Sequence, residues 1–295
     1  MERLKAEARY ARFMISPAMI IVFGIILVPI LATFVYSLVD SDLMSSTRGQ
    51  FRGLHFYAAI LSGHEFWASL GRTMYFTVSS TVIETVCGLF IALLLNQKFP
   101  GVRFLQAVVI IPWALPTVVS GSLWKLMFNG EYGVINEILS RLHLISGAQS
   151  WLGNPRTALT AIVIADAWKM TPLAVIFFLA ALQGIDYAMI EAAMMDGASP
   201  VQRLNKIILP ELKPTILIVV VMRTVEKFKG FDLFYLMTRG GPSNATKTLM
   251  YSAYQEAFQH LNYSEAATYS YLIAMIVVLM TLLYLKVLRR QGEQT

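Results

Sequence analysis

Long apolar runs constrain the fold of this chain more than any other feature of its sequence. A helix needs about 20 residues to cross the ~30 Å hydrocarbon core of a bilayer, and six runs reach that length. Backbone groups in lipid must be hydrogen-bonded within the segment, and the alternating pattern of barrel strands is absent, so each run is expected to be a helix. The predicted spans are residues 14–38, 71–95, 103–128, 158–182, 214–237 and 266–288.

The charge content agrees with a membrane environment. Only 14% of the 295 residues are charged, whereas a soluble domain carries about 25%. The first run follows a basic head but exceeds the ~7–15 residues of a signal-peptide core and lacks a small-residue cleavage site, so we expect a retained span. The sequence therefore predicts an all-α, polytopic transmembrane bundle of six spans that forms a single domain over residues 1–295.

Six spans place both termini on the same side of the membrane. The connections on that side carry twelve Lys and Arg residues, and the opposite connections carry seven. Positive residues concentrate in cytoplasmic loops, which predicts cytoplasmic N- and C-termini and one long cytoplasmic loop at residues 183–213. The net charge of +6 is thereby explained as an orientation signal, and no nucleic-acid partner is expected.

The 183–213 loop has the pattern of two short helices joined by a turn. Asp186 is a candidate N-cap for a first helix at about 187–196. Gly197 suits the left-handed residue that follows the end of such a helix.

The second short helix has its own start and stop signals. Ser199 followed by Pro200 suits an N-cap and a first helical residue, because proline lacks the N–H that would be unpaired there. We expect this helix to run from about 200 to 208, with Pro210 ending it.

A motif in this loop carries a family resemblance. The loop contains Glu-Ala-Ala, three residues, Gly, nine residues and Ile-x-Leu-Pro, which resembles the cytoplasmic loop signature of ABC importer permeases without any departure in spacing. In that family the loop forms the coupling helix that docks in a cleft of the ATPase subunit, where the Glu pairs with a basic group and the Gly allows the turn. Residues 183–213 are therefore called the coupling loop below. The resemblance implies ATPase-coupling positions at Glu191, Ala192, Ala193, Gly197, Ile207, Leu209 and Pro210.

Two further stretches, 112–136 and 240–258, resemble the carbohydrate branch of these permeases. The second is similar to the first-subunit class of the maltose-type, binding-protein-dependent family, although segment 39–70 is too short for the large periplasmic insertion of the maltose example. The resemblance implies a multi-pass protein of the bacterial plasma (inner) membrane. It also implies a second homologous permease, two ATPase subunits that bind ATP and Mg, an extracytoplasmic solute-binding protein and a carbohydrate substrate. No cofactor is expected in this chain itself.

Ionisable residues inside the predicted spans indicate polar surfaces within the bundle. Charges at membrane depth are costly and usually face a cavity or one another. Helical spacing gives the candidate substrate-path residues: Asp166, Lys169, Met170 and Leu173 on one face, and Arg223, Glu226 and Lys227 on another. Two interpretations stay open. The faces line the translocation path, as the matching positions contact sugar in the resembling permeases, or the charges pair internally, Asp166 with Lys169 and Arg223 with Glu226.

The charges set this chain apart from the resembling permeases, in which these positions are largely neutral polar or aromatic. Basic groups in a cavity bind carboxylate or phosphate through charge-assisted hydrogen bonds. The first hypothesis for the substrate is therefore an acidic oligosaccharide such as an oligouronide. A neutral oligosaccharide and a sugar phosphate resembling glycerol phosphate are the alternatives.

Two other classes of protein fit the sequence less well. The four histidines are far apart in predicted external loops without metal-ligand spacing, and the sequence has no P-loop motif, so we expect neither an enzyme nor a metal site. An ion-coupled secondary transporter is an alternative because intramembrane carboxylates suit proton or sodium coupling. Six spans are few for a monomeric carrier, however, and the coupling-loop motif argues for an ATP-driven system.

Overall fold

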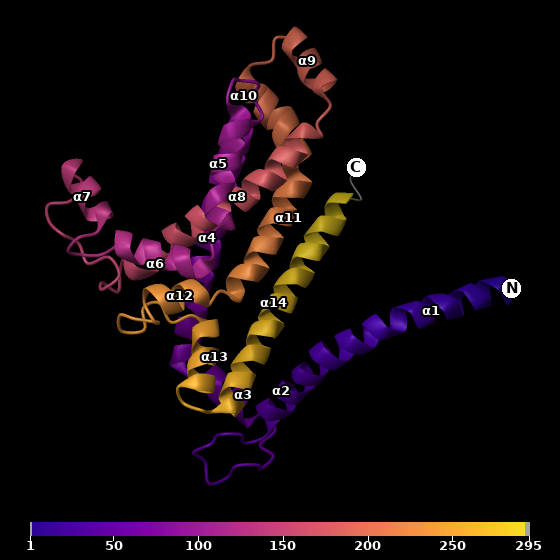
Figure 1. Cartoon of the computed structure of the whole chain (residues 1–295), viewed down its shortest axis with the longest axis vertical. Coiled ribbons are helices and arrows are strands. Elements are labelled where there is room, and N and C mark those ends of the chain that lie inside the picture. Colours follow the sequence, from indigo (N-terminus) through magenta and orange to yellow (C-terminus); the bar gives the residue numbers. More distant parts are fainter. Residues whose placement is uncertain (1, 293–295) are drawn as a thin grey trace. The chain divides into compact units, whose positions relative to one another are not determined.

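The computed structural model describes residues 2–292, which are almost entirely helical (Figure 1). Within that range, extended pairing is limited to two isolated bridges, Val39 with Phe51 and Asp42 with Asn262, so the all-α prediction is confirmed for the described residues. The helices are α1 (Glu2–Val22), α2 (Val28–Leu38), α3 (His55–Ser62), α4 (His64–Leu95), α5 (Val102–Ala114), α6 (Thr117–Met127), α7 (Val134–Arg141), α8 (Ala158–Gln183), α9 (Tyr187–Met195), α10 (Pro200–Arg203), α11 (Leu209–Phe228), α12 (Asp232–Met237), α13 (Leu249–Phe258) and α14 (Tyr263–Gly292), with π-helical turns η1 (Phe23–Leu27) and η2 (Leu204–Ile208).

The chain divides into two compact units. The first comprises the residues up to His64 together with Ser252–Leu272. The second comprises Glu65–Tyr251 together with the residues from Ile273 onward. All of the candidate substrate-path and coupling residues belong to the second unit.

In the first unit, Asp40 organises the segment that follows α2. Its carboxylate accepts hydrogen bonds from the hydroxyls of Thr47 and Ser45 and from the backbone N–H of Asp42. The hydrogen bond from Thr47 contributes most, and together these bonds hold the pKa of Asp40 below its ordinary value.

Within residues 2–292, four helical segments are long and apolar enough to cross a membrane. They are Arg12–Leu38, His64–Leu95, Ala158–Gln183 and Tyr263–Lys286, each overlapping a predicted span. The pair α5–α6 adds a fifth if both helices form one crossing. The count of six spans therefore stays a prediction.

The run predicted as a single span at 103–128 is broken in the structure. α5 ends at Ala114, Leu115 is extended, and α6 begins at Thr117, so that the two helices meet at 92°. Pro116 explains the break, because the residue before a proline is disfavoured in the helical conformation. The prediction of one continuous helix was wrong here.

The run predicted at 214–237 is also divided. α11 (Leu209–Phe228) ends before the run does, and α12 (Asp232–Met237) is a separate short helix. At the break, the N–H of Gly230 donates to the carbonyl of Lys227 over 3.0 Å. The last turns of α11 therefore lie next to an irregular segment, which leaves room for a cavity.

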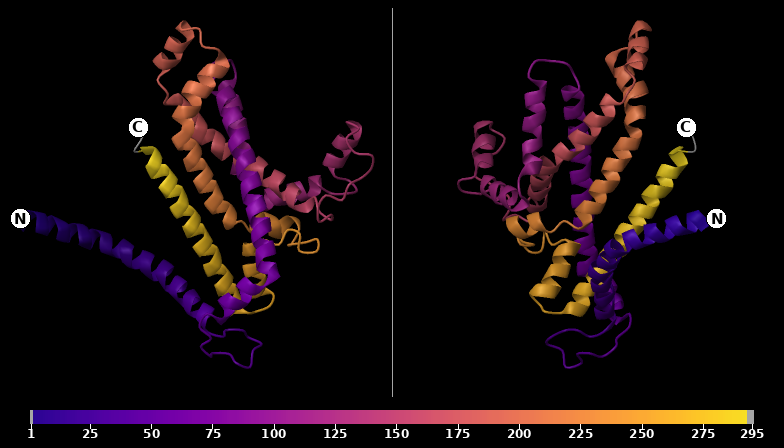
Figure 2. Two further views of the ribbon diagram at one scale, coloured as in Figure 1. Left: turned by 180° about the vertical axis from the view of Figure 1, so that it is seen from behind. Right: turned by 45° about the vertical axis from the view of Figure 1, so that its right-hand side comes forward.

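Small residues let α4 and α8 approach closely. A Cβ atom added to Gly88 would lie 2.7 Å from the Cβ of Ala174. Buried apolar residues, among them Ala92 and Phe178, continue this contact toward the coupling loop. Figures 1 and 2 show α9 and α10 beyond the ends of α8 and α11, away from α6 and α12. In the second unit, the coupling loop and the polar faces thus lie at different levels of the same two helices.

Candidate functional site

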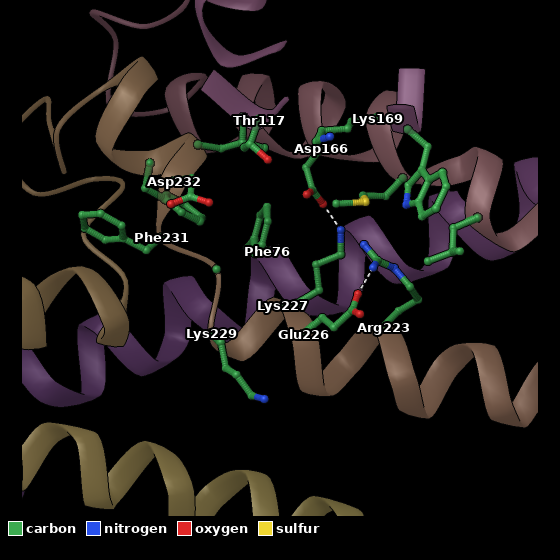
Figure 3. Close-up of a pocket in the computed structure, with 16 residues that line it drawn as sticks. Phe76, Thr117, Asp166, Lys169, Arg223, Glu226, Lys227, Lys229, Phe231 and Asp232 are labelled. Atoms are coloured by element: carbon green, nitrogen blue, oxygen red, sulfur yellow. Dashed lines mark hydrogen bonds and ion pairs between the residues drawn. The ribbon is translucent and has the colours of Figure 1, made fainter. Parts of the chain in front are cut away.

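A cavity of about 390 Å³ lies among α4, α5, α6, α8, α11 and α12 (Figure 3). Its volume falls within the roughly 300–1,000 Å³ of small-molecule sites. All seven residues that the sequence predicts for the substrate path line it, from two helices: Asp166, Lys169, Met170 and Leu173 of α8, and Arg223, Glu226 and Lys227 of α11. The structure therefore brings together the two polar faces that helical spacing identified.

Other lining residues escaped the prediction. Phe76 comes from α4, Thr117 from the first turn of α6, and Phe231 from the segment before α12. A usable signal for α4 is present in the sequence, since hydroxyl and small residues recur at helical spacing before Glu84, and that face is buried in the structure. Thr117 and Phe231 follow helix breaks, which hydropathy does not reveal.

The charged residues form one connected ion-pair network. The Nε of Arg223 lies 2.8 Å from Oε2 of Glu84. Lys227 contacts Oε1 of Glu84 and also Oδ2 of Asp166, and Arg223 contacts Oε2 of Glu226. The network thus runs in the order Asp166, Lys227, Glu84, Arg223, Glu226, with alternating charge, and joins α4, α8 and α11.

Internal pairing is present, but only half of it follows the predicted partners. Arg223 does pair with Glu226. Asp166 instead pairs with Lys227 across to α11, while the Nζ of Lys169 donates to the carbonyl of Leu115 over 2.6 Å. The Leu115 carbonyl lies in the break between α5 and α6 and is outside the regular helical ladder, so it attracts a donor. These side chains line the cavity and also pair with one another, so the pairing is compatible with a translocation path, which stays a prediction.

Aromatic residues lie at different places relative to the cavity. Trp113 and Phe231 line it. Trp124 and Trp168 instead contact each other edge to face at 5.7 Å between ring centroids. The Nζ of Lys227 lies 5.3 Å from the centre of the Phe76 ring, so one wall of the cavity combines an aromatic face with a buried cation.

The first half of the coupling loop follows its predicted geometry. The Asp186 carboxylate accepts a hydrogen bond from the N–H of Ala188 and caps α9. Gly197 has φ +78°, the left-handed conformation expected after the helix. The side chains of Tyr187 and Met195 are exposed, so an apolar surface is uncovered at this end of the second unit.

The second half of the loop is only partly as predicted. Ser199 caps α10 in a capping box with Gln202, and Pro200 is the first helical residue. Pro210 does not end the helix, because the π-helical turn η2 (Leu204–Ile208) leads directly into α11. Pro210 is accommodated because it lies in the first turn of α11. The prediction that Pro210 ends the second helix was therefore wrong.

Sequence comparison places these features among known proteins. The family described as "Binding-protein-dependent transport system inner membrane component" matches residues 84–290. The trehalose/maltose transport system permease protein MalF of Thermococcus litoralis is 40% identical over 95% of this chain and 94% of its own length. The sulfoquinovosyl glycerol transport system permease protein SmoG of Agrobacterium fabrum is 31% identical over 95% and 90% of the two chains. From the same organism, the sn-glycerol-3-phosphate transport system permease protein UgpA is 33% identical over 78% of each chain.

A solved structure has the same fold. A chain of a bacterial ABC transporter involved in the import of the acidic polysaccharide alginate superposes with a TM-score of 0.84, covering 98% of this chain and 99% of that one. The two sequences are 20% identical, so the likeness concerns the fold.

Proposed function

The chain belongs to the family of binding-protein-dependent transport system inner membrane components, and from this membership we propose that it is one permease subunit of an ATP-driven ABC importer for carbohydrate. As a member of this family it is a non-enzymatic membrane component. The observation that carries the proposal is the charged cavity between α8 and α11, because the coupling loop connects these same two helices.

The proposed assembly contains this chain, a second homologous permease, two ATPase subunits and an extracytoplasmic binding protein. ATP and Mg bind to the ATPase subunits, and this chain needs no cofactor of its own. The excess of Lys and Arg on one side supports cytoplasmic termini in the plasma (inner) membrane. The trehalose/maltose permease at 40% identity supports a carbohydrate rather than another class of solute.

The continuity of α10, η2 and α11 supports transmission of motion from the ATPase to the cavity. The helical path runs without a break from Pro200 to Phe228. A displacement of the proposed docking residues, Glu191 and Gly197 among them, would move α11 along its axis and shift Arg223 against α8. Of the other predicted coupling positions, Ile207, Leu209 and Pro210 lie on this path, and Ala192 and Ala193 lie before it in α9.

The ion-pair network favours a neutral oligosaccharide as the substrate. Arg223 and Lys227 each touch two carboxylates, so most of their positive charge is already compensated within the protein. Carboxylate oxygens such as those of Asp166 and Glu226 accept hydrogen bonds from sugar hydroxyls, and Trp113 and Phe231 offer faces for the sugar ring.

One observation supports an acidic oligosaccharide as the substrate. Lys169 lines the cavity and donates to a backbone carbonyl, so its charge meets no carboxylate among the ion pairs of the described residues. The neutral and the acidic substrate can be distinguished by measuring uptake into proteoliposomes. Maltotriose and trigalacturonate are each supplied with a binding protein that carries that sugar. Uptake of maltotriose alone supports the neutral sugar, and uptake of trigalacturonate alone supports the acidic one.

The importer assignment is tested by binding-protein-stimulated ATP hydrolysis of the reconstituted complex. We expect Glu191→Ala combined with Gly197→Pro to abolish stimulation while the complex still reaches the membrane. Glu137→Ala is the matched control, because Glu137 is an exposed residue of α7 whose pair with Arg141 is worth little. Full stimulation in the double variant, or sugar uptake driven by an ion gradient without ATP, would contradict the proposal.

A further inference from the structure

Glu84 lies behind the cavity wall and holds the charged residues of that wall in place. It is 0% exposed and sits in the middle of α4. Each of its two carboxylate oxygens faces a different cation, Oε2 toward Arg223 and Oε1 toward Lys227. A buried carboxylate of this kind is stable only when it is paired in this way.

The two ends of the network reach the cavity as carboxylates. Asp166 joins the network through Oδ2 and Glu226 through Oε2 (Figure 3), so one oxygen of each remains for donors from a ligand. The Glu226 side chain is 50% exposed. Both cations thus contact the buried Glu84 on one side and a cavity-lining carboxylate on the other.

The charge of the wall depends on Glu84. The network holds three carboxylates and two cations. The remaining charged residues that line the cavity are Lys169, Lys229 and Asp232, which contribute one net positive charge. With Glu84 the set is formally neutral, and without it the set carries a charge of +1.

We propose that Glu84 is a specificity-determining residue of the importer, which pairs Arg223 and Lys227 from behind so that the cavity accepts uncharged oligosaccharides and disfavours anionic ones. This inference rests on the proposed function. Glu84 acts through these two cations and is not among the residues that line the cavity. It is therefore a positioning residue and does not bind the sugar directly.

The size of the effect follows from electrostatics. A unit charge about 8 Å from a ligand carboxylate, at an effective dielectric constant of about 20, changes a binding constant by about 30-fold. Solvent in the cavity reduces this value. We therefore expect Glu84→Gln to raise the preference for trigalacturonate over maltotriose by about 10-fold or more.

The test measures equilibrium binding of maltotriose and trigalacturonate to the complete transporter complex in lipid nanodiscs, without binding protein. Gln keeps the shape of Glu84 and removes its charge. The control is Ser80→Ala, one turn earlier on the same buried face, where the hydroxyl has no hydrogen-bond partner among the described residues. A third variant, Glu84→Gln with Arg223→Gln, restores the charge balance.

The outcomes separate charge balance from a merely structural role. We expect the ratio of the two dissociation constants to shift in Glu84→Gln and to stay unchanged in Ser80→Ala. In the double variant it should return toward the wild-type ratio. An unchanged ratio in Glu84→Gln, or equal weakening of both probes, overturns it. If Glu84→Gln does not assemble, Arg223→Gln alone decides, because loss of one cation should shift the ratio toward maltotriose. An unchanged ratio in that variant, or failure of both single variants to assemble, also overturns the inference. A wild-type complex that binds neither sugar also overturns the inference, because the cavity then has no affinity for Glu84 to adjust. Absence of binding-protein-stimulated ATP hydrolysis in the wild-type complex would instead refute the proposed function.

Discussion

The packing of α4 against α8 can be tested by comparing two glycines of α4. Gly88, at the contact, has no room for a methyl group, whereas Gly71 has room for one. A Cβ on Gly88 would lie 2.7 Å from the Cβ of Ala174 and 3.4 Å from two backbone atoms of α8. A Cβ on Gly71 meets no atom of the described residues within 4 Å. Both residues belong to α4, so the two Gly→Ala substitutions change helix propensity alike and differ in packing.

The expected magnitudes follow from these distances. Gly→Ala in a helix gains roughly 0.5–1 kcal/mol, and overpacking a well-filled contact costs about 1–3 kcal/mol. We expect Gly71→Ala to stabilise the protein by roughly 0.5–1 kcal/mol. Gly88→Ala should destabilise it by roughly 0.5–2 kcal/mol after the propensity gain is subtracted.

Thermal unfolding of the detergent-solubilised protein, followed by tryptophan fluorescence, measures the order of stability. Gly71→Ala should unfold above the wild type and Gly88→Ala below it. The double variant Gly88→Ala with Ala174→Gly removes the 2.7 Å contact and leaves the backbone atoms at 3.4 Å, so it should recover most of the loss. Gly88→Ala that is as stable as Gly71→Ala, or a double variant no better than the single one, would refute the packing.

Two further predictions concern loops of the second unit. Asn136→Ala removes the side chain that donates to the carbonyls of Gly130 and Gln149 and accepts from the indole of Trp151. It should lower the free energy of unfolding by about 2–3 kcal/mol, measured by urea titration in mild detergent, and a loss below about 0.5 kcal/mol would contradict these bonds. Gly240→Ala places a Cβ 2.7 Å from the Tyr251 ring at φ +80° and should cost about 1–3 kcal/mol in the same titration. Gly147→Ala is its control, because a Cβ there meets no atom of the described part of the chain within 4 Å. Equal effects of the two variants would speak against the structure of this turn.

Local signals predicted the coupling loop well. Asp186, Gly197 and Ser199 act within three residues of the helix ends that they define, so their spacing in the sequence is sufficient. The prediction for Pro210 was wrong because proline disrupts the interior of a helix but is tolerated in the first turn, and Pro210 lies in the first turn of α11. The π-helical turn before it supplies a new first turn, and nothing in the local sequence marks that turn.

Hydropathy found where the apolar segments are but not where they bend. Pro116 follows a residue that leaves the helix, yet the apolar run continues on both sides of it, so the 92° bend is hidden from a window average. The irregular segment around Gly230 is hidden for the same reason. These breaks create space for the cavity, and therefore Thr117 and Phe231 were missed as lining residues.

The ion-pair partners of the buried charges could be predicted from the sequence only where both residues lie on the same helix. Arg223 and Glu226 are three residues apart on one helix, and helical spacing predicts their pair. Glu84 is 139 residues from Arg223 and 143 from Lys227, and its partners depend on how α4 packs against α11. The same spacing rule failed for Asp166 and Lys169, because Lys227 and the Leu115 carbonyl offered better-placed partners from other helices.

We propose that sugar crosses the membrane through the cavity between α8 and α11. The most direct measurement is an electron cryo-microscopy structure of the complete complex with its loaded binding protein and maltotriose, trapped before ATP hydrolysis. We expect sugar density within hydrogen-bonding distance of Asp166 and Glu226 and beside Trp113 or Phe231. Sugar density confined to a different set of helices, with this cavity closed by protein side chains, would contradict it.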